Sequence, residues 1–224
     1  MQKAQSSLYS KGWDVGLRVI RYPEFLSIWS VGASLSILRW LEMLAVGVVV
    51  FDITASPLYV ALMIILRFLP FIILGFLSGA ISERINRRIG LIVMMSLMAI
   101  ASLYFALKTV SGQITLPLIA ISVLLNGLIW ALDFPIRRTL FADVVPASQL
   151  GIALTLDSVT SNITRFLGPL IGGLFLEFVG IEGVFFLGTA LYLIATLTMV
   201  FGTRKAGNRL SEMKGGFLSS LVTG

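Results

Sequence analysis

Apolar stretches of about 20 residues recur along the whole chain, separated by short segments that contain glycine, proline or charge. A helix of this length crosses a hydrocarbon core of about 30 Å. A water-soluble domain needs roughly a quarter of charged residues to cover its surface, whereas this chain has 12% charged and 57% hydrophobic residues. The sequence therefore predicts an integral membrane protein.

The breaker residues divide the apolar sequence into six spans. Lipid cannot satisfy free backbone amides, so each span is expected to be helical, and no alternating pattern indicates a membrane β-barrel. Ser56 and Pro57 start the second span, and Gly180 and Gly183 separate the last two. The expected helices cover residues 25–50, 57–81, 89–108, 115–136, 150–178 and 184–202.

Basic residues gather on one side of the expected bundle. Thirteen of the 17 lysines and arginines lie before the first span, after the last, or in the second-to-third and fourth-to-fifth connections, and only Lys108 lies on the other side. By the positive-inside rule both termini are cytoplasmic. Residues 1–24, which lack the apolar core of a signal peptide, are then a cytoplasmic arm, 25–202 the six-helix transmembrane bundle, and 203–224 a cytoplasmic tail. The net charge of +6 is a topology signal, and no nucleic-acid partner is expected.

The chain lacks both cysteine and histidine. Their absence removes thiolate chemistry, the commonest general base and the commonest metal ligand. An intramembrane enzyme would need a Ser–Lys dyad or paired aspartates. The one lysine near a span, Lys108, lies at an outer edge, and Asp133 and Asp157 sit in no recognisable aspartyl protease motif. We therefore expect no enzyme activity, no metal and no cofactor.

Three arginines, Arg39, Arg67 and Arg165, lie near the middle of predicted spans. A central arginine costs roughly 2.5–3.5 kcal/mol on insertion scales. Facing lipid, each would be unfavourable, so these side chains are expected to face the bundle interior or a wet cavity. A polar cavity at the membrane midplane is what a transporter or channel needs.

The connection GAISERINRRIG, residues 79–90, resembles the cytoplasmic loop signature of the major facilitator superfamily. That signature is a glycine, three residues, then Asp-Arg-x-Gly-Arg-Arg or Lys. Glu83 stands where aspartate is usual, and Asn86 stands where glycine is usual, since asparagine also tolerates a left-handed turn. A basic loop that merely obeys the positive-inside rule would explain the arginines but not the spacing. The matching residues are Gly79, Arg84, Arg87 and Arg88.

A second match, GPLIGG, resembles the helix-5 motif found especially in exporters of this superfamily, and its residues are Gly168, Pro169, Gly172 and Gly173. The first and third of these form a small-xxx-small pair that permits close helix approach. The proline cannot donate to the carbonyl of Arg165, so the helix can kink there. An ordinary packing face with a proline kink explains the glycines equally well, and both interpretations stay open.

Further segments are similar to the exporter branch that includes enterobactin-exporter and macrolide-efflux-like proteins: TASPL at 54–58, RFLP at 67–70 and DVVP at 143–146. The resemblance covers about residues 20–205. It implies an all-α membrane protein whose six transmembrane helices form one half of a major-facilitator fold, built as a 3+3 inverted repeat. It also implies alternating access driven by a proton gradient, and a second six-helix half or a homodimer partner.

The function expected from this resemblance is proton-coupled export of a small amphipathic molecule across a bacterial cytoplasmic (inner) membrane. The alternative is a non-transporting truncated fragment, or an assembly partner that needs a second six-helix half. The expected partners are the lipid bilayer, a small-molecule substrate and that second half.

The candidate substrate and proton pathway consists of Arg39, Glu42, Arg67, Asp157 and Arg165. Arg39 and Glu42 lie one turn apart and can face the same way, either as a proton-sensitive pair or as an ion pair that only lowers the cost of insertion. Asp157 is a second candidate proton carrier. Arg67 and Arg165 either converge on one cavity or find separate partners in helix packing.

A candidate gate lies at the cytoplasmic end of the fourth span. Asp133 and Asp143 flank that end and are expected to meet Arg87 or Arg88. A partly desolvated network of this kind can bias two conformational states by a few kcal/mol. The gating set is Gly79, Glu83, Arg84, Arg87, Arg88 and Asp133. Three tryptophans either line a hydrophobic pocket or belong to interface belts and packing: Trp29, Trp40 and Trp130.

Overall fold

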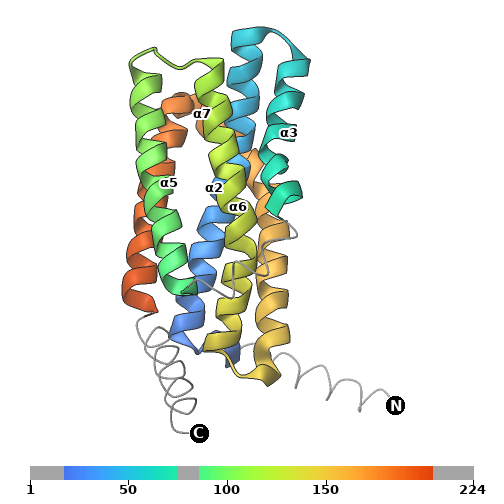
Figure 1. Cartoon of the computed structure of the whole chain (residues 1–224), viewed down its shortest axis with the longest axis vertical. Helices are drawn as coiled ribbons and strands as arrows, with labels where there is room; N and C mark the ends of the chain where they lie inside the picture. Colours follow the sequence, from blue (N-terminus) through green and yellow to red (C-terminus); the bar gives the residue numbers. More distant parts are fainter. Residues whose placement is uncertain (1–17, 75–85, 204–224) are drawn as a thin grey trace, which may run out of the picture.

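The computed structural model describes residues 18–74 and 86–203, and these form long helices that run side by side (Figure 1). The helices are α2 (Pro23–Thr54), α3 (Pro57–Leu74), α5 (Arg87–Val110), α6 (Leu116–Val144) and α7 (Ala147–Gly202). Each is long and apolar enough to cross a membrane. The expected all-α membrane fold is confirmed, and the described residues contain no strand.

Helix α7 is 56 residues long but is not one continuous rod, because its backbone leaves the helical region at Gly180 (φ 73°, ψ −179°). This combination is open almost only to glycine, which has no Cβ to clash. The chain reverses near this point (Figure 1). The segments 147–179 and 181–202 correspond to the last two of the six predicted spans, and at 1.5 Å per residue each is long enough to cross a bilayer.

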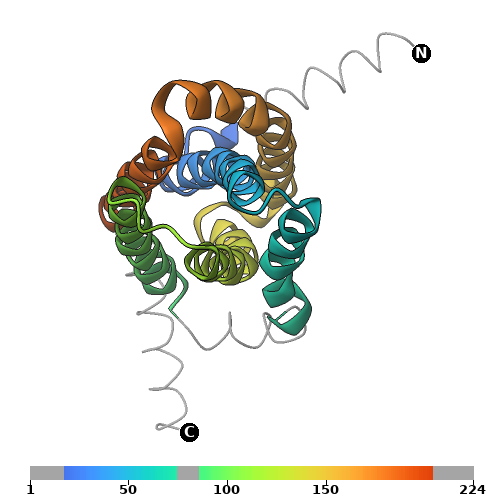
Figure 2. The same ribbon diagram turned by 90° about the horizontal axis from the view of Figure 1, so that it is seen from above.

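Helix α2 lies inside the bundle and packs along α7, while α5 packs on α7 and α3 packs on α6. Figure 2 shows α3 at one edge of the bundle and α5 at the other. The largest apolar core joins α2, α5, α6 and α7, and it includes Phe25, Ile28, Met95, Phe141 and Met199.

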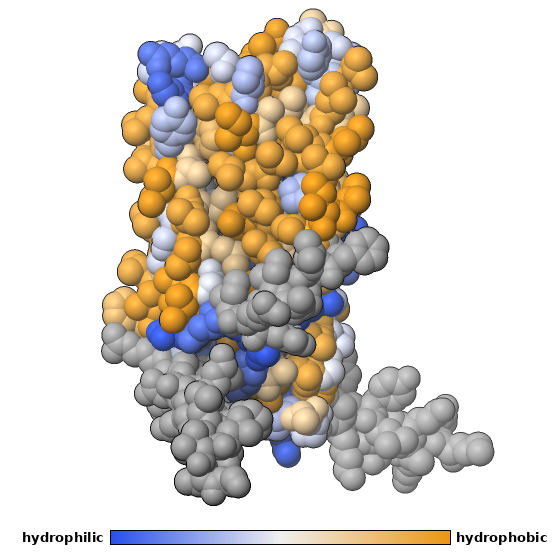
Figure 3. Space-filling view, in the orientation of Figure 1, coloured by the Kyte–Doolittle hydropathy of each residue, from blue (hydrophilic) through white to orange (hydrophobic). Residues whose placement is uncertain are grey.

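One end of the bundle, which we name the basic end, is where α2 and α5 begin and α6 and α7 finish. Arg87 donates there from Nη1 to both carboxylate oxygens of Asp143, at 2.8 and 2.7 Å. Lys108 lies at the opposite end, 2.6 Å from Gln113 Oε1. Figure 3 shows a broad apolar surface between the two polar ends. Arg87 and Lys108 therefore lie at opposite ends of the bundle, as the predicted topology requires.

The expected end of the fourth span at residue 136 is wrong. Helix α6 continues through Pro135 to Val144, and only Val145 and Pro146 separate it from α7. Pro135 lacks the amide hydrogen that would bond to the Ala131 carbonyl, yet the helix continues on both sides of it. Arg137, expected in a loop, is thus a buried residue of α6, and the carboxylates of Asp133 and Asp157 compensate its charge.

Asn86 does not adopt the left-handed conformation that asparagine tolerates. Its backbone is extended (φ −64°, ψ 106°), and it caps α5 by accepting a hydrogen bond from the Ile89 amide at 3.3 Å. Asparagine is among the best helix N-caps because its short side chain reaches a free amide of the first turn. The signature residues Gly79, Glu83 and Arg84 lie outside the described residues.

Two glycines of the GPLIGG segment lie at a close contact between α2 and α7. A Cβ at Gly168 would stand 2.5 Å from the Trp40 Cβ, and one at Gly172 would stand 3.2 Å from the Leu41 Cα. The two backbones can approach this closely only because these positions carry no side chain. The segment therefore sets the register between α2 and the first part of α7.

Replacing Gly168 by alanine is expected to loosen this contact. The added methyl group overpacks the α2 interface, which typically costs about 1–3 kcal/mol, so the midpoint of thermal unfolding in detergent should fall. Gly151 is the matched control in the same helix, since nothing lies within 4 Å of a Cβ built there. Gly151→Ala should leave the midpoint unchanged or raise it, because alanine favours helices. Equal midpoints for the two variants would contradict the close-contact assignment.

Candidate functional site

Four side chains form a polar row along one face of α6: Asn126, Trp130, Asp133 and Arg137. Their spacing of three and four residues places them on the same side of a helix. At 1.5 Å per residue the row is roughly 17 Å long, which is more than half of the thickness of a hydrocarbon core of about 30 Å. Three of the four are buried, and Trp130 is half-buried. The row therefore faces neighbouring helices and must find its partners there.

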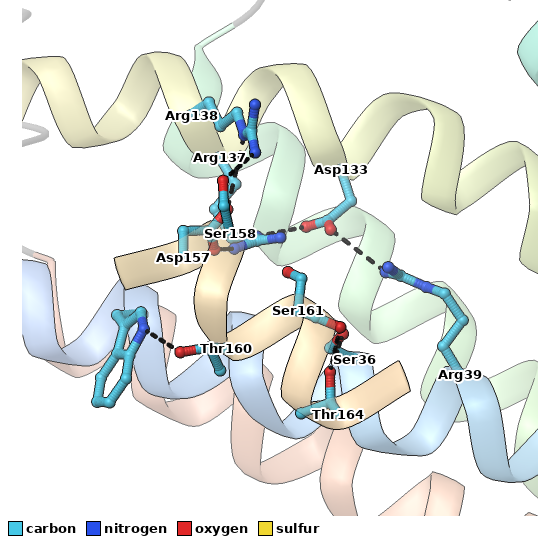
Figure 4. Close-up of polar contacts among 11 residues, drawn as sticks. Ser36, Arg39, Asp133, Arg137, Arg138, Asp157, Ser158, Thr160, Ser161 and Thr164 are labelled. Carbon is cyan, nitrogen blue, oxygen red and sulfur yellow. Dashed lines mark hydrogen bonds and ion pairs between the residues drawn. The ribbon is translucent and has the colours of Figure 1, made fainter. Parts of the chain in front are cut away.

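Near the basic end, the row takes part in an ionic cluster that ties α2, α6 and α7 together (Figure 4). Arg137 lies between two carboxylates, with its Nε 3.4 Å from Asp133 Oδ1 and its Nη1 donating to Asp157 Oδ1. Arg39 of α2 reaches Asp133 Oδ2 at 3.5 Å. Arg138 approaches Asp157 Oδ2 at 3.6 Å. If every group is ionised, three cations face two anions.

Helix α2 makes room for this cluster at Gly32. A Cβ there would clash with the guanidinium of Arg137, whose side chain is 2% exposed. Arg138 donates to Ser158 Oγ at 3.0 Å and its guanidinium carbon lies 4.0 Å from the centre of the Phe134 ring. The cluster is thus built into the packing and is not an exposed pair.

The other end of the row forms a second polar site, the Glu42 site, which consists of Glu42, Arg67 and Asn126. Asn126 donates from Nδ2 to Glu42 Oε2 and accepts from Arg67 Nη2 at 2.6 Å. The three residues come from α2, α3 and α6 and are 5%, 3% and 9% exposed. One amide therefore bridges a buried acid and a buried guanidinium.

A cavity of about 20 Å³ adjoins the Glu42 site, and its lining includes Ser102 and Ser122. This volume suits about one water molecule. Arg67 Nε is buried and has no hydrogen-bond partner within the described residues. The site therefore combines a carboxylate, a guanidinium and small hydroxyl side chains in a nearly closed space.

The expected pairing of Arg39 with Glu42 is wrong. Arg39 turns to Asp133 and lies 4.6 Å from the centre of the Trp130 ring, while Glu42 turns to Asn126. Each residue finds a partner on α6, which packs against this face of α2. The polar row of α6 thus separates the two charges that sequence spacing had placed together.

Arg67 and Arg165 do not converge on one cavity. Arg67 is buried in the Glu42 site, whereas Arg165 is exposed, with its guanidinium carbon 5.0 Å from the centre of the Trp40 ring. Arg165 lines a much larger pocket of about 640 Å³ between α2, α3 and the first part of α7. Arg67 is therefore enclosed among polar partners, whereas Arg165 faces a large, mostly apolar pocket.

The predicted gate contact forms between Arg87 and Asp143. The expected pairing of Asp133 with Arg87 or Arg88 is wrong, because Asp133 belongs to the ionic cluster. Arg88 instead donates to the Val200 carbonyl at 2.7 Å and to Thr203 Oγ1 at 2.9 Å. It joins the start of α5 to the end of α7.

The three tryptophans divide between packing and pocket roles. Trp29 donates to Thr160 Oγ1 at 3.1 Å and stacks on Phe25, so it joins α2 to α7 in packing. Trp40 and Trp130 meet edge to face with ring centres 6.2 Å apart, and Trp40 also lines the large pocket.

Sequence reasoning missed Asn126 and Arg137 as site residues. The available signal was their helical spacing with Trp130 and Asp133, but ending the helix at residue 136 hid it. Arg138 was likewise assigned to a loop. The amide of Asn126 carries no charge, so a single asparagine in an apolar run is a weak signal for a functional site.

A family model for transmembrane secretion effectors matches residues 16–224, which include every described helix and both polar sites. The chain belongs to this family. The transmembrane secretion effectors are part of the major facilitator superfamily, in agreement with the loop signature and the GPLIGG segment. The chain is an integral membrane protein of that superfamily.

Two of the curated relatives of this chain are transporters by name. It is 26% identical to the MFS-type transporter YfiS of Bacillus subtilis over 75% of the chain and 39% of the relative. It is 23% identical to the staphyloferrin A transporter of Staphylococcus aureus, over 71% of the chain and 40% of the relative. A putative multidrug resistance protein, MdtD of Escherichia coli, is 27% identical over 64% of the chain and 29% of the relative. The chain thus spans less than half the length of these relatives.

Replacing Arg137 by glutamine is expected to destabilise the fold strongly. The change leaves two buried carboxylates, Asp133 and Asp157, without their main cation, and breaking a buried pair costs about 3–5 kcal/mol. Arg87→Gln is the matched control, because Arg87 and Asp143 are 27% and 18% exposed and such a pair is worth about 1 kcal/mol or less. Denaturant unfolding followed by circular dichroism measures both. A similar loss in the two variants would refute the central role of Arg137.

Proposed function

We propose that this chain forms one half of a secondary transporter that exports a small amphipathic molecule in exchange for protons. The second half is a further six-helix unit, supplied by the rest of a longer protein or by a second copy. The two halves rock about the substrate site so that it opens to each side of the membrane in turn. The basic end faces the cytoplasm of a bacterial cell, as the distribution of lysine and arginine favours.

The observation that carries this proposal is the Glu42 site. Glu42 is 5% exposed and lies midway along a membrane-spanning helix. A carboxylate in that position is energetically costly unless a partner compensates its charge, and such residues commonly mark functional sites. Here its partner is Asn126, and the same amide binds Arg67. Adding a proton to Glu42 removes the negative charge that faces Arg67 and so changes the forces between α2, α3 and α6. A proton taken up or released there is thereby linked to helix packing.

A transport cycle also needs a contact that opens and closes at one face. The Arg87–Asp143 pair joins α5 to α6 at the basic end and is partly exposed. Because such a pair contributes little stability, it can break without unfolding the bundle. The buried ionic cluster, by contrast, holds α2, α6 and the first part of α7 as one unit during the cycle.

The relatives support export. One is named as a transporter of staphyloferrin A and another as a putative multidrug resistance protein, and the family description is a secretion effector. The matched share of the relatives, between 29% and 40%, supports the need for a second set of helices.

Glu42→Gln tests the proton link. Glutamine keeps an oxygen that accepts from Asn126, so the fold should persist, but the side chain can no longer release a proton. In proteoliposomes with an imposed pH gradient, a panel of amphipathic anions, cations and neutral compounds is added and proton movement is recorded. The wild type should dissipate the gradient with one class of compound, and Glu42→Gln should abolish that response.

Glu177→Gln is the control, since Glu177 is an exposed residue of α7, and it should behave as the wild type. The complete gene product is reconstituted, and its mass in detergent establishes whether the second half is a separate domain or a second copy. Gradient-driven flux that survives Glu42→Gln would refute Glu42 as the proton site. A complex that shows no flux with any compound would favour a membrane component without transport activity of its own.

A further inference from the structure

The pocket of about 640 Å³ follows the face of α2 from Trp40 to Asp52 and is closed at its sides by α3 and the first part of α7. Twelve residues of helix make this path roughly 18 Å long. Its size falls within the range of ligand pockets, about 300–1,000 Å³. Most of its lining is apolar, with Met43, Val48 and Ile64 among the wall residues. The pocket therefore fits an elongated molecule that is largely apolar.

One end of the pocket holds a cation whose charge is not neutralised. No acidic side chain pairs with Arg165 among residues 18–74 and 86–203; its recorded contact is the face of the Trp40 ring. Arg39 also lies on a tryptophan ring, that of Trp130, but it has Asp133 as its counter-ion. An arginine near mid-span without a counter-ion costs several kcal/mol if it meets lipid, and an anion in the pocket would remove that cost.

The other end of the pocket carries the opposite charge, from Asp52. This carboxylate repels a second anionic group at that end. The pocket is thus polarised along its length, with a cation near mid-span and an anion near the end of α2. A ligand with one acidic group is held in one direction, with its acid beside Arg165.

We infer that this pocket binds an amphipathic organic monoanion, with its acidic group on Arg165 and its apolar body along α2. The inference rests on the proposed function in that the bound anion is the transported substrate. Trp40 holds the guanidinium in place from one side and leaves its hydrogen-bonding edge free for a carboxylate or sulfonate. An anionic lipid is a poorer occupant because its headgroup lies at the bilayer surface and not at mid-span.

The probe for the test is pyrene-1-butanoate, and its partner of opposite charge is pyrene-1-butylammonium. The chain is placed in nanodiscs of zwitterionic lipid, and energy transfer from tryptophan to pyrene is measured against protein-free nanodiscs. The wild type should bind the anion more tightly than the cation. Arg165→Gln should weaken anion binding roughly tenfold or more, the usual effect of losing a charge-assisted bond, while Arg165→Lys should retain part of it.

Two further variants separate the pocket from general charge effects. Lys108→Gln removes a cation of α5 that contacts Gln113 and does not line the pocket, and it should leave binding unchanged. Gly47→Leu fills the pocket, since Gly47 lines it and a Cβ there meets only Val60, at 3.8 Å. This variant should weaken the binding of both probes. It keeps the test valid if Arg165→Gln fails to fold.

A helix of the second half is the competing occupant. The chain has no cysteine, so Gly47→Cys introduces one thiol into it. In the complete gene product, with any cysteines of its remaining part replaced, that thiol should react with a small maleimide and be protected by pyrene-1-butanoate. A thiol that never reacts would show that protein fills the pocket and would overturn the inference. Displacement of the probe by phosphatidylglycerol would assign the pocket to lipid and would overturn it too.

Binding and transport can fail separately. Anion binding that depends on Arg165 but is accompanied by no gradient-driven flux would support the pocket and refute the proposed function. Flux that depends on Glu42 but not on Arg165, together with equal binding of the two pyrene probes, would support the function and refute the pocket.

Discussion

The cost of placing charge in an apolar medium controls this structure, and Arg137 shows how the cost is met. A buried ion without a partner is unfavourable by several kcal/mol, so Arg137 requires Asp133 and Asp157 close by. Those carboxylates come from α6 and α7, and α2 must offer Gly32 to leave space for the guanidinium. Three helices are thereby held in one register at one depth.

The Glu42 site follows from that register. Asn126 lies on the same face of α6 as Arg137, three turns away, so fixing one end of the helix directs the other towards α2 and α3. Glu42 and Arg67 then meet the same amide. The glycines at 168 and 172 hold α7 against α2 from the opposite side. Elsewhere the helices expose apolar side chains.

The sequence predicts the spans well because apolar length and breaker residues are local signals. Ser56 and Pro57 mark the start of α3, and Gly180 marks the reversal within α7. The predicted end of the fourth span is wrong because Arg137 and Arg138 resemble a polar connection when their partners are unknown. The same reason explains the wrong pairing of Arg39 with Glu42. Which neighbour a charged side chain selects depends on how adjacent helices rotate, and one sequence does not contain that information.

Two of the three arginines near mid-span, Arg67 and Arg165, differ in what surrounds their charge. Arg67 is enclosed and bonded to Asn126, so its charge acts within the fold and any change at Glu42 alters it. Arg165 is exposed and lacks a counter-ion within the described helices, so its charge can bind an anionic group of a ligand or of another protein segment. Trp40 and Trp130 lie between Arg165 and Arg39, so two aromatic rings connect the large pocket to the ionic cluster. A ligand that neutralises Arg165 would therefore contact α2 and α7, two of the three helices that the cluster holds in register.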